Sequence, residues 1–290
     1  MLQVPVKRLI CGFEIPVLGL GTWMIGGNSQ RDPGNDGDAD AATLTAGIEY
    51  GYTHIDTAEL YAAGYTEEIV GRAIPGISRP KLFITTKVWS TNLSYDGVLR
   101  AVEGSMKRMG IDYIDLYLIH KPNDEIPLAD TMRALDRLAD EKVIRNIGVS
   151  NFAVSRFEQA QLLSSHKIVA NQVHYNLIFR EVEVKGMLDY CQNHDVMLIA
   201  WRPLQKGVLF ENSGEILNSL CGKYLKTPAQ IALNWLISQK NVATLSTMRS
   251  PAHLEENAGA FGWTMDSEDI EFLRKDFPEQ CNVSNSVVLS

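Results

Sequence analysis

Residues 82–120, LFITTKVWSTNLSYDGVLRAVEGSMKRMGIDYIDLYLIH, contain the pattern that decides the fold. An apolar, β-branched run at 82–87 is followed by a helical stretch at 94–109. In that stretch Val98, Val102 and Met106 recur four residues apart, and Gly110 ends the pattern. A second apolar run follows at 114–120. Two strands separated by a helix indicate a parallel pair, because parallel neighbours need a long crossover connection.

The same alternation of strand and helix runs through most of the chain. Strands are expected at 17–20, 53–56, 82–87, 114–120, 145–149, 169–175, 196–201 and 242–247. Helices are expected at 41–50, 65–74, 94–109, 128–141, 154–164, 181–193, 228–239 and 252–262. Eight strands, each followed by a helix, predict an α/β protein with a (β/α)8 TIM barrel. Segments 6–9 and 13–16 predict an N-terminal β-hairpin that closes the bottom of the barrel.

A doubly wound open sheet is the alternative fold for this pattern. It would carry a glycine-rich dinucleotide fingerprint after the first strand, but Met24 stands where the third glycine would follow Gly19 and Gly21. The barrel is therefore favoured. One domain over residues 1–290 is expected, because no linker or low-complexity tract divides the chain. Residues 26–40 are expected to form a long loop at the mouth of the barrel.

Composition excludes several other classes of protein. The 290 residues are 45% hydrophobic and 21% charged, as in a globular protein with a full core. The net charge of −8 argues against a nucleic-acid partner, which needs a basic face. No apolar run approaches the roughly 20 residues of a membrane span, and no secretory signal is evident, so a cytoplasmic location without membrane binding is expected. The four cysteines form no C-x-x-C pair, so no metal site is expected.

Polar residues end three of the expected strands, where barrel enzymes place their chemistry. Asp56, Lys87 and His120 each follow an apolar run, and Tyr61 stands five residues after Asp56. An ammonium near a phenol lowers the phenol pKa, and a carboxylate holds that ammonium in place. With a histidine to bind a carbonyl oxygen, this set suits hydride addition to a carbonyl and protonation of the resulting alkoxide. The alternative is a purely structural role for all four residues. Asp56 and Lys87 would then form an ion pair, His120 would cap a strand, and Tyr61 would pack in the core.

Four blocks of the sequence resemble the aldo-keto reductases. GYTHIDTAELY at 51–61 is similar to the first family signature, and MKRMGIDYIDLYLIH at 106–120 is similar to the second. IGVSNF at 147–152 and NQVHYN at 171–176 match two further blocks, and the likeness extends from about residue 9 to residue 272. The resemblance implies that Tyr61 is the general acid, that Lys87 lowers its pKa and that Asp56 supports Lys87. It also implies that His120 orients the substrate carbonyl.

The resemblance further implies a nicotinamide cofactor extended across the barrel mouth without a Rossmann domain. Ser150, Asn151 and Gln172 would hold its carboxamide, and Trp201 would stack on the nicotinamide ring. The other expected contacts of the cofactor are Gly21, Thr22, Trp23, Asp56, Arg202, Pro203, Leu204, Gly207, Ser246, Thr247, Met248, Arg249, His253, Glu256 and Asn257. From the residue types alone, Ser150 and Asn151 would cap a strand and Trp201 would be a core aromatic.

The chain departs from the family pattern at the far end of the cofactor. Many members have Lys at the position of Thr247 and Arg at that of His253, and both are missing here. Another branch has Arg where Arg249 stands, followed by Ser-Pro as in this chain. A guanidinium suits a 2′-phosphate through bidentate hydrogen bonds, so NADPH is the expected cofactor and NADH a weaker or dual one. A solvated loop charge is the alternative for Arg249. Arg202 replaces the small hydroxyl residue usual after the aromatic.

Residues after the strands are expected to set the choice of substrate. The substrate would contact Trp23, Met24, Tyr61, Trp89 and His120. An apolar wall of this kind suits an aldehyde or ketone. Lys121 stands where Trp is common in relatives; a cation there would suit a carboxylated or phosphorylated carbonyl, unless the lysine is simply solvated.

The expected function is the reversible, NADPH-dependent reduction of a small aldehyde or ketone to an alcohol by a cytoplasmic monomer, with no metal. Two functions of other classes stay open. One is a Schiff-base aldolase or lyase that uses Lys87 as its nucleophile. The other is a non-catalytic regulator that retains a nicotinamide cofactor as a redox sensor.

Overall fold

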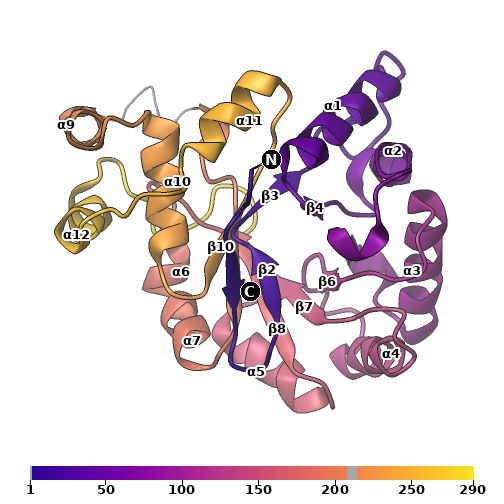
Figure 1. Cartoon of the computed structure of the whole chain (residues 1–290). Coiled ribbons are helices and arrows are strands. Elements are labelled where there is room, and N and C mark those ends of the chain that lie inside the picture. Colours follow the sequence, from indigo (N-terminus) through magenta and orange to yellow (C-terminus); the bar gives the residue numbers. More distant parts are fainter. Residues whose placement is uncertain (1, 208–213) are drawn as a thin grey trace.

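The computed structural model describes residues 2–207 and 214–290. Within them, eight parallel strands close into a barrel, with helices outside (Figure 1). Around the barrel the strands are β10 (Val242–Ser246), β3 (Leu18–Gly21), β4 (His54–Asp56), β5 (Phe83–Val88), β6 (Leu116–Ile119), β7 (Ile147–Ser150), β8 (Ile168–His174) and β9 (Met197–Trp201). The TIM barrel predicted from the sequence is confirmed, and each expected strand lies within two residues of its predicted ends.

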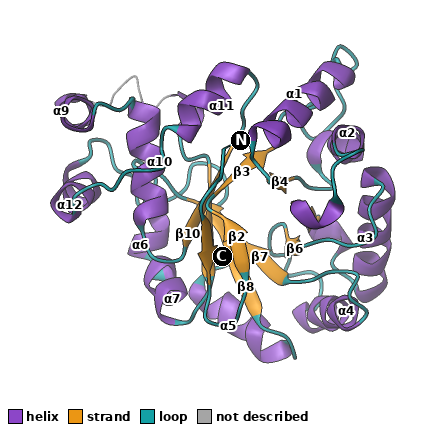
Figure 2. Ribbon diagram, viewed as in Figure 1, coloured by secondary structure: helices purple, strands orange, loops and turns teal. Residues whose placement is uncertain are grey.

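Helices form the outer layer, shown in purple around the orange strands in Figure 2. They are α1 (Gly37–Tyr50), α2 (Tyr65–Ala73), α3 (Tyr95–Met109), α4 (Leu128–Asp140), α5 (Val154–Leu163), α6 (Glu181–Val184), α7 (Met187–Asn193), α9 (Gly214–Tyr224), α10 (Pro228–Ser238), α11 (Pro251–Ala258) and α12 (Ser267–Asp276). In α3, Ser94 caps the start and Gly110 ends the helix in the left-handed region at φ 66°. Its buried face carries Val98 and Val102, as the sequence pattern predicts.

Several helical segments differ from the sequence prediction, and α11 ends at Ala258 rather than at residue 262. The expected loop 26–40 is shorter, because Asp36 accepts hydrogen bonds from the Asp38 and Ala39 amides and α1 begins at Gly37. The helix expected at 181–193 divides into α6 and α7, because Gly186 at φ 71° breaks the helical backbone. Helices α9 and α12 were not predicted from the sequence at all.

The N-terminal hairpin is present and covers one end of the barrel. Its strands, β1 (Val6–Arg8) and β2 (Glu14–Pro16), pair antiparallel. Leu9, Phe13 and the fully buried Ile15 pack in one apolar cluster with barrel residues that include Leu116 and Met197. This apolar plug closes the bottom of the barrel, so chemistry is confined to the opposite mouth.

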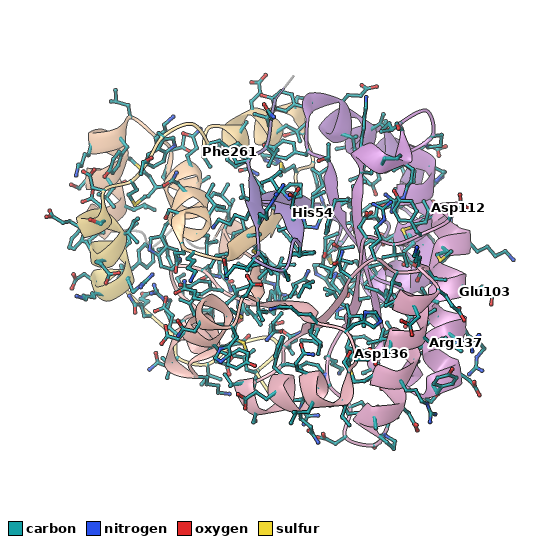
Figure 3. All side chains as sticks on the ribbon, turned by 60° about the horizontal axis from the view of Figure 1, so that its bottom comes forward. His54, Glu103, Asp112, Asp136, Arg137 and Phe261 are labelled. Carbon is teal, nitrogen blue, oxygen red and sulfur yellow. The ribbon has the colours of Figure 1, made fainter. Side chains whose placement is uncertain are left out.

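Side chains also fill the inside of the barrel. Figure 3 shows His54 among the central strands, whereas Glu103 and Arg137 extend from the outer helices. His54 is fully buried, and its ring lies edge-on to Phe83 with 5.0 Å between centroids. A Cβ added to Gly19 would lie 2.5 Å from His54 Nδ1, so glycine is required where β3 passes this ring. The filled interior makes the barrel a rigid base for the side chains at its mouth.

Candidate active site

The four side chains singled out from the sequence lie together at the mouth of the barrel. Asp56 ends β4, Lys87 lies in β5, His120 follows β6, and Tyr61 begins a short 3-10 helix, η1 (Tyr61–Gly64). Lys87 Nζ lies 2.6 Å from Asp56 Oδ1 and 3.3 Å from the Tyr61 hydroxyl. The Tyr61 and His120 rings meet edge-on, with centroids 5.6 Å apart. The four side chains come from the ends of three strands and from one loop, so it is the closed barrel that brings them together.

A strained turn directs the Tyr61 side chain into the mouth. The two residues after it, Ala62 and Ala63, have left-handed backbones at φ 49° and 54°, where alanine is rarely found. The Ala62 amide donates a 2.7 Å hydrogen bond to the carbonyl of Asn28 in the loop after β3. That bond ties the turn to the neighbouring loop and holds Tyr61 over Lys87.

Lys87 is fully buried, and each N–H of its ammonium group has a hydrogen-bond acceptor. Asp56 Oδ1, the Thr57 carbonyl at 2.8 Å and the Tyr61 hydroxyl surround it. Burial alone would lower the pKa of Lys87, but the Asp56 carboxylate and Tyr61 raise that pKa above its ordinary value. Lys87 therefore stays charged at neutral pH.

The pKa of Tyr61 differs from the sequence-based expectation. Burial raises the pKa of the phenol, and although the Lys87 ammonium lowers it, the net pKa stays above its ordinary value. The expectation of an acidic phenol is therefore wrong in its net direction, because desolvation outweighs the nearby charge. A raised pKa keeps Tyr61 protonated at neutral pH, as a proton donor must be.

His120 is held as a neutral ring. Burial, with the charges of Lys87 and Lys121, lowers the pKa of His120 well below its ordinary value. Its Nδ1 is buried and has no hydrogen-bond partner among the residues that the structure describes. Trp89 packs edge-on against the ring with centroids 5.1 Å apart. A neutral imidazole can bind the oxygen of a carbonyl group by donating one hydrogen bond.

The three residues expected to hold an amide group form a connected chain beside Asp56. Gln172 Nε2 donates to Asp56 Oδ2 at 2.7 Å, and Ser150 Oγ donates to the Gln172 carbonyl at 2.7 Å. Asn151 Nδ2 lies 2.9 Å from Ser150 Oγ, and Asn151 Oδ1 accepts a 3.3 Å hydrogen bond from Trp201 Nε1. Asn151 has a left-handed backbone at φ 63°, so its side chain returns over the strand end. These contacts link Trp201 to Asp56.

The residues expected at the far end of a cofactor lie on two loops. The first loop follows β9. There Arg202 is half-buried at φ 56°, and its guanidinium lies 5.2 Å from the centroid of the Trp201 ring. Pro203 is buried, Leu204 is half-buried, and Gly207 has φ 90°. The second loop follows β10. There Ser246 Oγ accepts a 3.3 Å hydrogen bond from Asn257 Nδ2, and Met248 is buried. Glu256 is half-buried, and the exposed residues are Thr247, Arg249 and His253. The predicted set thus borders the mouth on the β9 and β10 side.

Arg249 bridges two loops of the mouth. One of its guanidinium nitrogens donates a 2.8 Å hydrogen bond to the carbonyl of Met24, which follows β3. The next residue, Ser250, caps α11 by accepting a hydrogen bond from the His253 amide at 3.3 Å. The start of a helix favours anions, so this corner combines an arginine with a positive helix end.

The expected substrate wall is only partly enclosed. Trp23 packs edge-on against Tyr61 with centroids 4.9 Å apart, and Trp89 packs against His120. Gly21 and Thr22 lead into this wall, and Thr22 Oγ1 donates to the Asp56 carbonyl at 2.9 Å. Met24 is 43% exposed, so it lies at the rim. One indole thus contacts the phenol and the other contacts the imidazole.

Sequence reasoning missed several residues that hold the site. Glu59 accepts hydrogen bonds from the Trp89 amide and from Asn92 Nδ2, the latter at 3.1 Å, and so fixes the loop after β5. Ser284, near the C-terminus, bonds to His174 Nδ1 at 2.8 Å. Glu59 stands inside the first signature block and could have been flagged as a half-buried acid. Ser284 is 110 residues from its partner, and no sequence pattern indicates their contact.

No helix within residues 2–207 and 214–290 has the length and apolar character to cross a membrane. Across the same residues, His, Cys, Asp and Glu side chains nowhere gather as a group of three able to hold a metal ion.

The fold and this cluster define a (β/α)8 barrel protein with a buried phenol, ammonium and carboxylate at its mouth. The model of the Aldo/keto reductase family matches residues 17–275, and the chain belongs to that family. The family assignment made from the sequence blocks is therefore confirmed.

Individual relatives are similar over nearly the whole chain. The glyoxal reductase of Bacillus subtilis is 36% identical over 274 residues, covering 93% of this chain and 92% of the relative. The crystal structure of the thermostable aldo-keto reductase Tm1743, in complex with the inhibitor epalrestat, has a TM-score of 0.90 and 41% identity over 93% of this chain and 98% of its own. An aldo-keto reductase from Klebsiella pneumoniae in complex with NADPH has a TM-score of 0.84 and 32% identity over 99% of both chains.

Proposed function

We propose that this protein reduces small aldehydes or ketones reversibly to alcohols with NADPH, and that Tyr61 is the proton donor. The observation that carries the proposal is the Lys87 ammonium, 3.3 Å from the Tyr61 hydroxyl and 2.6 Å from Asp56. Such a phenol can give its proton to a developing alkoxide, because the ammonium stabilises the phenolate that remains. Membership of the aldo/keto reductase family supports the class of reaction.

Each side chain has a separate task in this scheme. When bound, the reduced nicotinamide supplies a hydride to the carbonyl carbon. His120 donates a hydrogen bond to the carbonyl oxygen and orients it. Tyr61 transfers its hydroxyl proton to that oxygen as negative charge develops there, and Lys87 stabilises the phenolate. Asp56 keeps Lys87 charged, and in the oxidative direction the same proton returns to Tyr61.

The residues at the mouth fit a nicotinamide cofactor. Ser150, Asn151 and Gln172 offer the hydroxyl and amide groups that a carboxamide requires, and the half-buried Trp201 offers an indole for stacking. Arg202 forms no ion pair within the described residues, so its charge is available to the pyrophosphate. The remaining contacts proposed are Gly21, Thr22, Trp23, Asp56, Pro203, Leu204, Gly207, Ser246, Thr247, Met248, His253, Glu256 and Asn257.

We infer that NADPH is preferred and that NADH binds more weakly. Arg249 lies beside the start of α11, where a 2′-phosphate would meet both a guanidinium and a positive helix end. The Klebsiella pneumoniae relative binds NADPH, which supports this choice.

The substrate is proposed to be a small carbonyl compound that contacts Trp23, Met24, Tyr61, Trp89 and His120. The similarity to a glyoxal reductase supports small, reactive aldehydes. Lys121 holds its ammonium 4.7 Å from the Trp89 ring centroid, where it would also suit a carbonyl compound with an anionic group. We further infer one domain over residues 1–290, a cytoplasmic monomer, and no nucleic-acid or membrane partner.

The Schiff-base alternative is disfavoured by the bonding of Lys87. A nucleophilic amine needs a free lone pair, but the three N–H groups of the Lys87 ammonium face Asp56, the Thr57 carbonyl and Tyr61. A redox regulator would use the same cofactor site and differ only in slow turnover.

An assay at the reduced-nicotinamide absorbance band, with NADPH and NADH against glyoxal, short aldehydes and sugars, tests the proposal. Absence of turnover with every carbonyl, despite tight NADPH binding, would favour the regulator.

A further inference from the structure

A column of three stacked rings stands at the proposed nicotinamide site. Trp201 lies parallel to His174, with centroids 4.2 Å apart and 4° between their planes. On its other side His174 stacks on Phe179 at 4.4 Å and 22°. His174 is 2% exposed and Phe179 is 6% exposed, whereas Trp201 is only half-buried. The buried part of the column therefore sets the plane of the indole that the cofactor would meet.

Two hydrogen bonds fix the rotation of the His174 ring within this column. Its Nε2 lies 2.9 Å from Gln205 Oε1 and its Nδ1 lies 2.8 Å from Ser284 Oγ. Asn176 Nδ2 donates to the same Gln205 oxygen at 3.1 Å, so that oxygen is an acceptor. His174 Nε2 is closer to this oxygen, at 2.9 Å, than to Asn176 Nδ2, at 3.4 Å, which assigns the proton to Nε2. Nδ1 then accepts from the Ser284 hydroxyl. Burial lowers the pKa of His174 to about 4, so the ring is neutral at neutral pH.

Ser284 is itself held in a fixed orientation. Its Oγ accepts hydrogen bonds from the Ser286 and Val287 amides, each at 3.2 Å, which leaves the hydroxyl proton directed at His174. The Ser284 amide donates to Glu181 Oε2 at 3.0 Å, and the Leu289 amide donates to Glu181 Oε1 at 3.2 Å. This buried carboxylate anchors the C-terminal segment 284–290 on α6.

The same segment reaches Trp201 by a second route. The Ser290 amide donates to the Asn151 carbonyl at 3.2 Å, and the Ala153 amide donates to Ser290 at 3.0 Å. Asn151 Oδ1 in turn accepts from Trp201 Nε1. Segment 284–290 thus contacts both residues that hold the Trp201 indole. These are His174, which stacks on the indole, and Asn151, which accepts a hydrogen bond from its Nε1.

We propose that Ser284 is a positioning residue for the cofactor, which acts through His174 to hold Trp201 in the plane that stacks on the nicotinamide ring. The proposal rests on the proposed function, because it requires a nicotinamide at Trp201. Without the Ser284 hydroxyl, Nδ1 of His174 loses its donor, and the ring loses one of the two hydrogen bonds that fix its rotation. The indole then loses its parallel support, while the adenosine end of the site, on the β10 loop, is untouched.

Calorimetric titration of the full chain with NADPH and with adenosine 2′,5′-bisphosphate, which lacks the nicotinamide half, tests this. Ser284→Ala is expected to weaken NADPH binding about 3- to 10-fold, as for the loss of one hydrogen bond, and to leave adenosine 2′,5′-bisphosphate binding unchanged. Ser286→Ala is the matched control, since Ser286 is exposed in the same segment. Ser284→Cys, nearly the same size but a weak donor, gives the same readout if the alanine variant does not fold.

A double-mutant cycle separates positioning from general loosening of the fold. In a His174→Phe background, which keeps a stacked ring without the Nδ1 acceptor, Ser284→Ala is expected to have no further effect on NADPH binding. Equal weakening of both ligands, unchanged NADPH binding, or full additivity in the cycle would overturn the proposal. If the unaltered protein binds adenosine 2′,5′-bisphosphate and NADPH equally, or binds neither, the nicotinamide site itself is wrong and the proposed function fails instead.

Discussion

Lys87 Nζ contacts the Tyr61 hydroxyl at 3.3 Å and, on its other side, Asp56 Oδ1 at 2.6 Å. One ammonium therefore couples a neutral phenol to a buried carboxylate. The carboxylate offsets the cost of burying the ammonium, and the ammonium offsets the cost of forming phenolate. Without Lys87, burial would favour the protonated form of Asp56, and Tyr61 would stay a phenol with no nearby charge to stabilise its phenolate.

The first prediction concerns Lys87. Lys87→Met is expected to lower the turnover of an aldehyde with NADPH by about 10²- to 10⁴-fold, because Tyr61 loses the charge that stabilises its phenolate. Lys240→Met is the control, because Lys240 is exposed on the connection between α10 and β10. Steady-state kinetics of both variants provide the measurement. Covalent trapping of substrate on Lys87 by borohydride in the unaltered protein would point to the lyase instead.

Arg249 determines the second prediction. Arg249→Gln is expected to weaken NADPH binding about 10- to 100-fold and to leave NADH binding nearly unchanged, because only NADPH carries the 2′-phosphate. Arg133→Gln serves as the control, since the Arg133 side chain is 67% exposed on α4, where it contacts Asp130 and the Tyr95 ring, far along the chain from the β10 loop. Titration of protein fluorescence with each cofactor gives the affinities. An equal loss for both cofactors would mean that Arg249 supports the loop rather than the phosphate.

Buried histidines should make the fold sensitive to acid. Burial lowers the pKa of His54 to about 3 and that of His174 to about 4. Below about pH 6.5 the unfolded chain protonates these rings and the folded protein does not, so unfolding takes up protons and stability falls as pH drops. Each ring contributes up to about 1.4 kcal/mol per pH unit between its folded pKa and 6.5.

Urea unfolding from about pH 7 to pH 5 measures this effect, in a range above most carboxyl pKa values. His54→Gln is expected to reduce the slope of the unfolding free energy against pH by about 1.4 kcal/mol per pH unit near pH 5, which corresponds to the uptake of one proton fewer on unfolding. His194→Gln, at an exposed position, is expected to leave the slope unchanged. A stability that does not vary over this range would show that the buried rings are protonated in the folded state.

A fourth prediction tests the packing inside the barrel. Gly19→Ala is expected to destabilise the fold by about 1–3 kcal/mol, because the added Cβ would lie 2.5 Å from His54 Nδ1 and 2.8 Å from Leu245 Cδ2. Gly222→Ala in α9, where nothing lies within 4 Å of the new Cβ, is expected to stabilise the fold by up to about 1 kcal/mol. Thermal unfolding of the two variants compares them directly, and a loss of stability in both would contradict the packing argument.

Local patterns were sufficient to predict the barrel. Each strand is a short apolar run and most helices carry a buried stripe, as in α3, so element order alone indicated the eight-fold closure. Strand ends also placed Asp56, Lys87 and His120 at one mouth, because parallel strands of a barrel end on the same face. The division of 181–193 was visible only in the backbone, where Gly186 adopts a positive φ.

Long-range relations could not be predicted in the same way. Ser284 and His174 are 110 residues apart, and no pattern in either segment indicates their contact. The net pKa of Tyr61 depends on how completely the phenol is buried, which is a property of the assembled mouth rather than of any segment. Sequence reasoning identified the charge of Lys87 correctly and underestimated desolvation.

The most direct test of the account is the turnover of Tyr61→Phe, followed as loss of reduced-nicotinamide absorbance, together with its NADPH affinity. The phenylalanine keeps the ring packed against Trp23 and His120 and removes only the proton donor. We predict that turnover falls by about 10²- to 10⁴-fold while the dissociation constant for NADPH stays within about twofold. Undiminished turnover in a folded Tyr61→Phe protein would contradict the assignment of Tyr61 as the donor.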